Sequence, residues 1–345
     1  MVLNTDFTQH ELQLDRPFQI SRGTLESTSV TTVRISDGTH TGIGGAAPDS
    51  YYGETSETVQ SLLPKLLDCV DEIDDIHRLE EVEQTLNAAV RNNPAAKAAI
   101  SIAAHDLVCK QLDVPLYRYW GLSPEQAVPT SYTIGIDSPS AMAEQATEAV
   151  KKGFPILKVK LGTDQDKEII RAIRDVAPDV RIRVDANEGW TPTEAINISR
   201  FLTQHDIEFL EQPVPSDHPQ ALQTVYEHVS IPIAADESCR TLSDIPQIAD
   251  ACDIANLKLM KCGGLREAIR MIHTARAHGL EVMLGCMIES NASIAAACHL
   301  TPLLDYADLD GSLLLEDDLY DGIPIDRGHI QLAEHEYPGT GAIKN

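Results

Sequence analysis

The chain has 345 residues, of which 43% are hydrophobic and 23% are charged, and its formal net charge at pH 7 is -26. This length and composition allow a substantial core and exclude a disordered or fibrous protein. The negative charge argues against a nucleic-acid partner and against an anionic membrane surface, because both require basic patches.

Targeting and redox signals point to one compartment. No basic segment followed by an apolar run stands near the start, and no stretch approaches the ~20 apolar residues of a membrane span. The seven cysteines are an odd number and include no Cys-x-x-Cys pair, which is typical of a reducing environment. We therefore expect a cytoplasmic protein.

The first ~125 residues predict an α+β domain. Strands are expected around Glu11–Leu14, Val30–Ser36 and Thr41–Ala47. One helix should begin near Ser56. A second should follow Asn93, which has the sequence of a helix cap before Pro94, and should run through Leu107.

From about Val128 onward, short runs rich in β-branched residues alternate with helical patterns. The eight strand candidates are Pro129–Ile136, Ile156–Leu161, Val180–Ala186, Ile207–Gln212, Ile231–Glu237, Ile254–Met260, Glu281–Cys286 and Tyr306–Asp310. The helical patterns are Ser138–Lys152, Asp164–Val176, Thr191–Gln204, Leu265–His278 and Ser290–Leu300. This alternation implies parallel strands with right-handed crossovers, and eight such strands close most easily into a barrel.

Acidic residues stand at the ends of three successive strand candidates, where barrel enzymes place their chemistry. They are Asp185, Glu211 and Asp236, each one strand-plus-helix unit after the last. A single acidic residue there could cap a helix, but three on one rim would repel each other unless a cation lay between them. Oxygen ligands without histidine or cysteine favour a hard ion, and Mg²⁺ fits best because it keeps sites open for substrate oxygens.

Lysines end the second and sixth strand candidates. Lys158 and Lys160 alternate to the same face of one strand, and Lys258 lies inside the other. All three should point into the barrel, from opposite sides of the metal. We expect an interior ammonium among other cations to have a lowered pKa and to act as a base near neutral pH.

Seven segments carry a resemblance to a known family: Pro17–Gly23, Pro48–Glu54, Lys158–Lys160, Val184–Asn187, Glu211–Pro213, Asp236–Ser238 and Lys258–Gly264. They resemble the enolase superfamily, its muconate lactonizing subgroup and, within that, dipeptide epimerases of the L-Ala-D/L-Glu type. The resemblance covers nearly the whole chain. It implies a modified TIM barrel, (β/α)7β, over residues 126–315, an α+β capping domain with specificity loops over 1–125, and a tail over 316–345 that packs on the cap.

The resemblance also implies roles for the residues at the rim. Asp185, Glu211 and Asp236 match the magnesium ligands. Lys160 and Lys258 match the two opposed acid/base catalysts, and Lys158 matches a cation that steadies the substrate carboxylate. Lys261 competes with Lys258 for its role, but strand alternation should turn it the opposite way, and the family pattern selects Lys258.

Substrate choice depends on other residues. Asp308 and Asp310 match a motif that holds the free α-ammonium of a dipeptide, and two carboxylates on one face of a strand suit that cation. Arg22 matches an arginine for the glutamate side chain of the substrate, and Thr133 is a further substrate-binding candidate. The blander alternatives are a surface arginine and a generally acidic stretch.

The same catalytic residues would also serve an o-succinylbenzoate synthase, an N-acylamino-acid racemase or a cycloisomerase. A barrel that only binds ligands is a further alternative, which the intact set of ligands and lysines disfavours. We find no histidine-aspartate pair at the sixth and seventh strands, which disfavours the mandelate racemase branch. The partner expected is a small dipeptide, and a homo-oligomer is possible.

Overall fold

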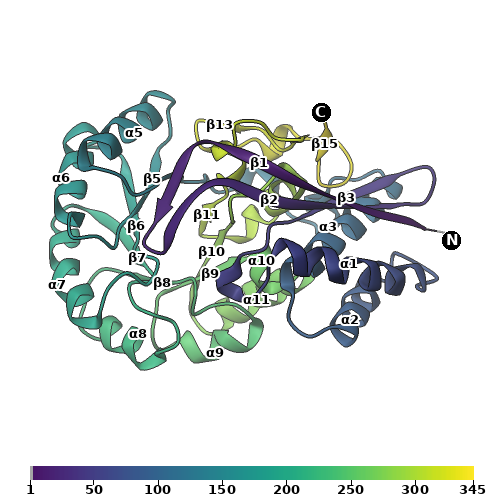
Figure 1. Cartoon of the computed structure of the whole chain (residues 1–345), viewed down its shortest axis with the longest axis horizontal. Coiled ribbons are helices and arrows are strands. Elements are labelled where there is room, and N and C mark those ends of the chain that lie inside the picture. Colours follow the sequence, from purple (N-terminus) through teal and green to yellow (C-terminus); the bar gives the residue numbers. More distant parts are fainter. Residues whose placement is uncertain (1–2) are drawn as a thin grey trace.

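The computed structural model describes residues 3–345, and its centre is a closed parallel barrel (Figure 1). Its strands are β4 (Tyr132–Ile134), β5 (Ile156–Lys160), β6 (Arg181–Asp185), β7 (Ile207–Glu211), β8 (Ile233–Ala235), β9 (Ile254–Lys258), β10 (Glu281–Gly285) and β11 (Tyr306–Asp308). They pair in chain order, and a parallel bridge between Thr130 and Ala307 closes the ring. The predicted eight-stranded barrel is confirmed.

Helices cover the outside of the barrel (Figure 1). They are α5 (Pro139–Lys151), α6 (Asp166–Val176), α7 (Pro192–Thr203), α8 (Pro219–Tyr226), α9 (Ile245–Ile248), α10 (Leu259–Cys262), α11 (Leu265–Ala277) and α12 (Asn291–Cys298). Because the strands face helices outside and packed side chains inside, they are buried almost throughout and read as near-continuous apolar runs. A polar residue that points from such a strand into the barrel therefore costs free energy of folding unless it is paired, and the lysines of β5 and β9 are residues of this kind.

The cap consists of an antiparallel sheet and four helices. They are β1 (Asn4–Ile20), β2 (Gly23–Ser36), β3 (Thr41–Ala46), α1 (Ser56–Asp71), α2 (Leu79–Ala89), α3 (Pro94–Gln111) and α4 (Leu116–Tyr119). The hairpin of β1 and β2 reaches across the barrel, and Ile136 N donates to Gln19 O at 2.7 Å (Figure 1). The turn of this hairpin, Ser21 and Arg22, thereby lies at the barrel rim.

The start of α3 differs from the expectation. Asn93 precedes Pro94 as predicted, but its φ of 55° is left-handed and its side chain caps no backbone group of the helix. The buried carboxylate of Glu54 does so instead, accepting from Ala95 N at 2.8 Å and Ala96 N at 3.1 Å. A negative charge at this end also suits the helix dipole. The capping group thus comes from a residue 41 positions earlier.

Two glycines let β3 lie directly on α3. A Cβ atom on Gly44 would stand 2.0 Å from Ala99 O and 2.8 Å from Ala103 N, both helix backbone atoms. Gly42 has a similar contact with Ala103 O. Backbone cannot move aside as a flexible side chain can, so these positions tolerate no side chain.

We expect Gly44→Ala to lower the free energy of unfolding by about 1–3 kcal/mol or more, through overpacking between β3 and α3. Gly45→Ala is the matched control, because its Cβ would meet its nearest atoms, on the side chains of Ala292 and Ser293, only at 3.2 Å. Urea denaturation of the two variants measures the difference. Equal losses would contradict the close approach.

The C-terminal tail returns to the cap. Glu316 N donates to Gln13 O at 2.9 Å, and β12 (Tyr320–Asp321) pairs with β15 (Ile343–Lys344). Thr340 N donates to the buried carboxylate of Asp106 in α3 at 2.7 Å. The tail thus contacts β1 and α3, while the domain boundaries at residues 125 and 315 stay predictions.

Candidate active site

The three acidic residues meet at one end of the barrel. Asp185 ends β6, Glu211 ends β7, and Asp236 directly follows β8. One carboxylate oxygen from each lies within 4.8 Å of the others, and all three side chains are buried. Consecutive parallel strands end on the same rim, so the convergence follows from the spacing in the sequence.

Burial opposes ionisation of all three carboxyl groups, and neighbouring charges decide the outcome. Nearby lysine ammonium groups hold the pKa of Asp185 and of Asp236 below the usual range. Burial and the charge of Asp185 raise the pKa of Glu211 to about 8. Glu211 is therefore the member of the three that its surroundings stabilise least as an anion.

This cluster suits a hard divalent cation. Its donors are carboxylate oxygens only, the set that Mg²⁺ prefers. Glu211 Oε2 is buried and accepts no hydrogen bond from residues 3–345, although Lys158 Nζ stands 2.9 Å away. Its nearest charged partner is thus the Lys158 ammonium, and a cation between the three carboxylates would supply a further positive partner for this oxygen.

Lysines flank the cluster from opposite sides. Lys160 Nζ, from β5, donates to Asp185 Oδ2 at 2.6 Å, and Lys258 Nζ, from β9, donates to Asp236 Oδ2 at 2.8 Å. Around the closed sheet, three strands separate β5 from β9 in either direction. The two ammonium groups therefore approach the carboxylates from opposite walls of the barrel.

The expected lowering of the lysine pKa values is wrong for two of the three lysines. Burial lowers the pKa of Lys258, but the carboxylates of Asp236 and its neighbours outweigh that effect and raise it above the usual value. The pKa of Lys158 is also raised, by Asp308, Glu211 and Asp185 against burial. Carboxylate oxygens stand 2.7–3.1 Å from Lys158 Nζ and 2.8 Å from Lys258 Nζ, and their charge outweighs both burial and the neighbouring cations.

Lys261 does not turn away from the site as predicted. Strand β9 ends at Lys258 and the short helix α10 follows, so strand alternation no longer applies. Lys261 Nζ donates to Asp236 Oδ1 and also to the backbone oxygens of Asp236 and Asn256, at 2.7 and 2.9 Å. Lys261 therefore fixes both the carboxylate and the backbone of Asp236.

A second group of carboxylates, Asp308 and Asp310, lies across the barrel from Asp185, Glu211 and Asp236. Asp308 accepts from Lys158 Nζ at 2.7 Å and from Ser131 Oγ at 2.5 Å. Asp310 accepts from Thr133 N at 2.5 Å and from Thr133 Oγ1 at 3.1 Å. Burial and the charge of Asp308 raise the pKa of Asp310 to about 7. The pair thus offers negative charge and acceptor atoms to a cation arriving from the cavity.

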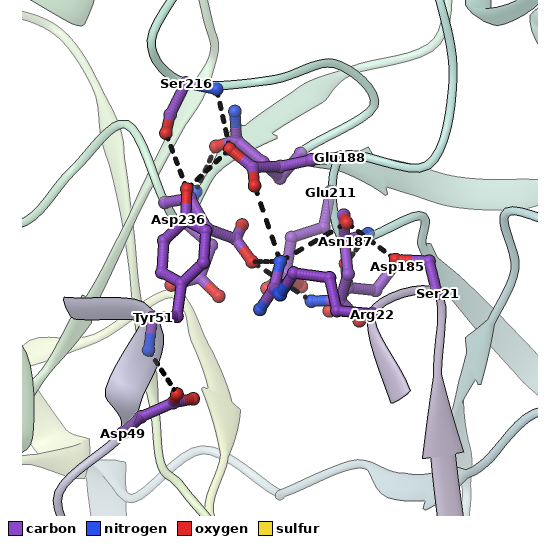
Figure 2. Close-up of polar contacts among 12 residues, drawn as sticks. Ser21, Arg22, Asp49, Tyr51, Asp185, Asn187, Glu188, Glu211, Ser216 and Asp236 are labelled. Carbon is purple, nitrogen blue, oxygen red and sulfur yellow. Dashed lines mark hydrogen bonds and ion pairs between the residues drawn. The ribbon is translucent and has the colours of Figure 1, made fainter. Parts of the chain in front are cut away.

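Arg22 reaches the rim from the hairpin turn (Figure 2). Its Nη1 donates to Glu237 Oε1 at 2.6 Å and to Asn187 O at 3.3 Å. Glu188 Oε2 is 3.6 Å away, and the guanidinium carbon lies 4.4 Å from the ring centroid of Tyr51. Arg22 is therefore held by the barrel loops and is not a free surface side chain.

A cavity of about 670 Å³ lies between the cap and the barrel. Seven of the ten predicted site residues line it: Arg22, Thr133, Lys158, Lys160, Lys258, Asp308 and Asp310. The cap and the β10 loop add an apolar wall: Phe18, Ile20, Leu25, Met287 and Ile288. The structure thus brings these seven residues to one cavity, and their roles stay predictions.

The sequence reasoning missed some neighbours of these residues. Asn256 Nδ2 donates to Glu211 Oε1 at 2.8 Å, and Ser131 orients Asp308. A signal for Asn256 was present, since it alternates with Lys258 on an apolar strand and so shares its face. Ser131 precedes β4 and gave no comparable signal.

Family models match most of the chain. The description "Mandelate racemase / muconate lactonizing enzyme, N-terminal domain" matches residues 4–121, and "Enolase C-terminal domain-like" matches residues 141–343. The chain belongs to this family, the enolase superfamily. The predicted fold, a (β/α)7β barrel behind a capping domain, agrees with this membership.

Individual members of the superfamily are similar over nearly their whole length. The L-Ala-D/L-Glu epimerase of Bacteroides thetaiotaomicron is 39% identical, over 98% of this chain and 87% of its own. A dipeptide epimerase from Enterococcus faecalis, in complex with Mg and L-Leu-L-Tyr, superposes with a TM-score of 0.93 at 32% identity, over 99% of each chain. The N-succinyl Arg/Lys racemase of Bacillus cereus superposes with a TM-score of 0.94 at 29% identity, over 100% of this chain and 96% of its own.

Proposed function

We propose that the protein is a magnesium-dependent dipeptide epimerase that inverts the α-carbon of the C-terminal residue, of the L-Ala-D/L-Glu type. The observation that carries this is the placement of Lys160 and Lys258 on opposite walls of the barrel, with Asp308 and Asp310 on a third side. Opposed bases permit inversion, because one lysine takes the α-proton from one face while the other gives a proton to the opposite face.

Each group has a defined task in this proposal. Asp185, Glu211 and Asp236 would hold Mg²⁺, which supplies positive charge where negative charge develops on the substrate carboxylate. Lys160 and Lys258 move the proton. The Lys158 ammonium, fixed by Asp308 and Glu211, stabilises the same developing charge.

The raised pKa of Lys258 links its reactivity to the metal. Asp236 and other carboxylates raise this pKa against burial, so neutralising those carboxylates removes the opposing effect. In this proposal, neutralising those carboxylates would bring the pKa of Lys258 down from its raised value.

The carboxyl pair favours a free dipeptide over an N-acylated amino acid. An α-ammonium can form charge-assisted hydrogen bonds with Asp308 and Asp310, whereas an acyl amide carries no charge to offset theirs. The similarity to a racemase of N-succinyl amino acids keeps that activity as the second candidate. The two candidates share the lysines and the metal.

Metal binding has a readout that does not depend on turnover. Mg²⁺ should raise the melting temperature of the chelator-treated protein, because a ligand that binds only the folded state stabilises it by mass action. Asp185→Asn should largely lose this rise, and Asp250→Asn, an exposed carboxylate, should keep it.

The same treatment should remove activity and Mg²⁺ should restore it. Full activity of the metal-stripped enzyme, or an equal thermal response of both variants, would contradict the metal site.

Two wider expectations stay proposals. No helix among residues 3–345 is long and apolar enough to cross a membrane. We keep the cytoplasm as the proposed compartment and a homo-oligomer as the proposed possible assembly. Fractionation and sedimentation measurements test them.

A further inference from the structure

A cap loop and two barrel loops meet in a compact polar cluster (Figure 2). Tyr51 belongs to the short helix η1 (Ser50–Tyr52), Glu188 follows β6, and Ser216 follows β7. Tyr51 Oη donates to Glu188 Oε1 at 2.8 Å and lies 2.9 Å from Ser216 Oγ, and Ser216 N donates to the same Glu188 oxygen at 2.6 Å. Every member contacts the other two.

The protons in this cluster can be assigned. Burial raises the pKa of Tyr51 to about 12, so its hydroxyl stays protonated at neutral pH. Its single proton goes to the Glu188 carboxylate, which can only accept, and the Ser216 hydroxyl then donates to Tyr51. Hydrogen bonds to a carboxylate are the stronger kind.

The backbone at Glu188 indicates that its side chain is used. Its φ is 67°, in the left-handed region, where a non-glycine residue is strained by about 1–2 kcal/mol. Glycine would adopt this φ without that strain. The contacts of the Glu188 carboxylate offset this strain. They are with Tyr51, Ser216 and, at 3.6 Å, the Arg22 guanidinium.

Arg22 rests on this cluster. Its guanidinium stacks on the Tyr51 ring, and its ionic contacts with Glu237 and Glu188 both use Nη1. Nε and Nη2 of Arg22 have no hydrogen-bond acceptor among residues 3–345, and Arg22 lines the cavity. Arg22 is thus held through Nη1 and through the guanidinium face that lies on Tyr51. Its Nε and Nη2 groups remain free to donate to a ligand.

We propose that Tyr51, Glu188 and Ser216 form a clasp that positions Arg22 to bind an acidic side chain on the second residue of the dipeptide. This inference rests on the proposed epimerase function. The three are positioning residues, because they touch Arg22 or one another and act on the substrate through it. Without the clasp, Arg22 keeps its charge and its hydrogen bond to Glu237, but the Glu188 carboxylate and the Tyr51 ring are no longer fixed beside it.

The test uses Tyr51→Phe, which removes the hydroxyl and keeps the ring under Arg22. With L-Ala-L-Glu we expect KM to rise about tenfold, as for loss of a charge-assisted hydrogen bond, with kcat nearly unchanged. With L-Ala-L-Gln, which has the same shape and no charge, we expect less than about a twofold change, because it makes no ionic contact with Arg22. Incorporation of deuterium from solvent follows both reactions.

The chain offers matched controls. Tyr337→Phe is the same change on an exposed tyrosine of the C-terminal tail that does not line the cavity beside Arg22, and it should leave both KM values unchanged. Ser216→Ala should raise KM for the acidic substrate less than Tyr51→Phe does, and Ser216→Thr, which keeps a hydroxyl, should restore it.

Four results would overturn the proposal: an equal rise in KM for both substrates, no rise at all, the same effect from Tyr337→Phe, or equal KM values of the wild type for the two dipeptides. Hydrogen–deuterium exchange of residues 47–54 tests the clasp independently of the proposed epimerase function. A wild type that epimerises no dipeptide refutes that function, whereas unchanged exchange in Tyr51→Phe refutes the clasp.

Discussion

Lys258→Ala should stop epimerisation, with a loss of about 10²–10⁴-fold or more, since a positioned acid/base group is removed from one face of the substrate. The loss should appear in kcat, because the metal ligands and the carboxyl pair remain. Conversion of L-Ala-L-Glu to L-Ala-D-Glu, followed by chiral chromatography, measures it. Lys160→Ala should give a loss of the same order.

Isotope exchange distinguishes a lost base from a collapsed site. Lys258→Ala retains Lys160 on the opposite wall, so one isomer of the dipeptide should still exchange its α-proton with D₂O without inversion. Lys160→Ala should show the same for the other isomer. Exchange of neither isomer by either variant would contradict the division of the two faces between the lysines.

Lys261 gives the comparison that tests the strand register. Its ammonium donates to two backbone oxygens as well as to Asp236, so Lys261→Ala should weaken metal affinity and lower the melting temperature. Lys258→Ala removes one hydrogen bond to Asp236 and no backbone contact, so it should lower the melting temperature less than Lys261→Ala does. If the effects are exchanged between the two variants, the assignment of the base is wrong.

Asp308→Asn should reduce turnover of a free dipeptide by about one to two orders of magnitude, as expected for a charge-assisted pair of about 1.5–3 kcal/mol. The buried carboxylate also holds Lys158, so part of the loss comes from that lysine. Asp310→Asn isolates the ammonium contact better, because the side-chain carboxylate of Asp310 accepts only from Thr133 among residues 3–345. Rates with each variant measure the two contributions.

An N-acetylated dipeptide is the control for this prediction. The wild type should turn it over poorly, since the acetyl group removes the charge and adds bulk beside the carboxyl pair. Asp310→Asn should lower activity on this substrate much less than on the free dipeptide. Equal or better turnover of the acetylated substrate by the wild type would indicate an N-acylamino-acid racemase instead.

Much of this site could be predicted because a parallel barrel repeats a simple geometry. Each strand delivers its last residue to one rim, so the positions of Asp185, Glu211 and Asp236 in the chain fixed their meeting point. Alternation along a strand placed Lys158 and Lys160 on one face for the same reason. Where a strand is regular, the local periodicity of the sequence is enough to predict which way its side chains point.

Contacts at irregular ends and between distant segments could not be predicted in this way. The turn after β9 reversed the direction expected for Lys261, and Glu54 took the capping role assigned to Asn93. Tyr51 and Glu188 belong to loops 137 residues apart, whose meeting depends on how the cap settles on the barrel. No local sequence pattern predicts that these two loops meet.

The carboxylate of Asp106 joins segments that leave the ribosome at very different times. Its Oδ2 accepts from Ile43 N at 2.8 Å, while Oδ1 accepts from Thr340 N, 234 residues later. At ~5–20 residues per second, synthesis of the intervening chain takes roughly 10–50 s. Throughout that time a buried Asp106 would lack part of its hydrogen bonding. The cap therefore gains this hydrogen bond only after Thr340 has been translated, 234 residues after Asp106.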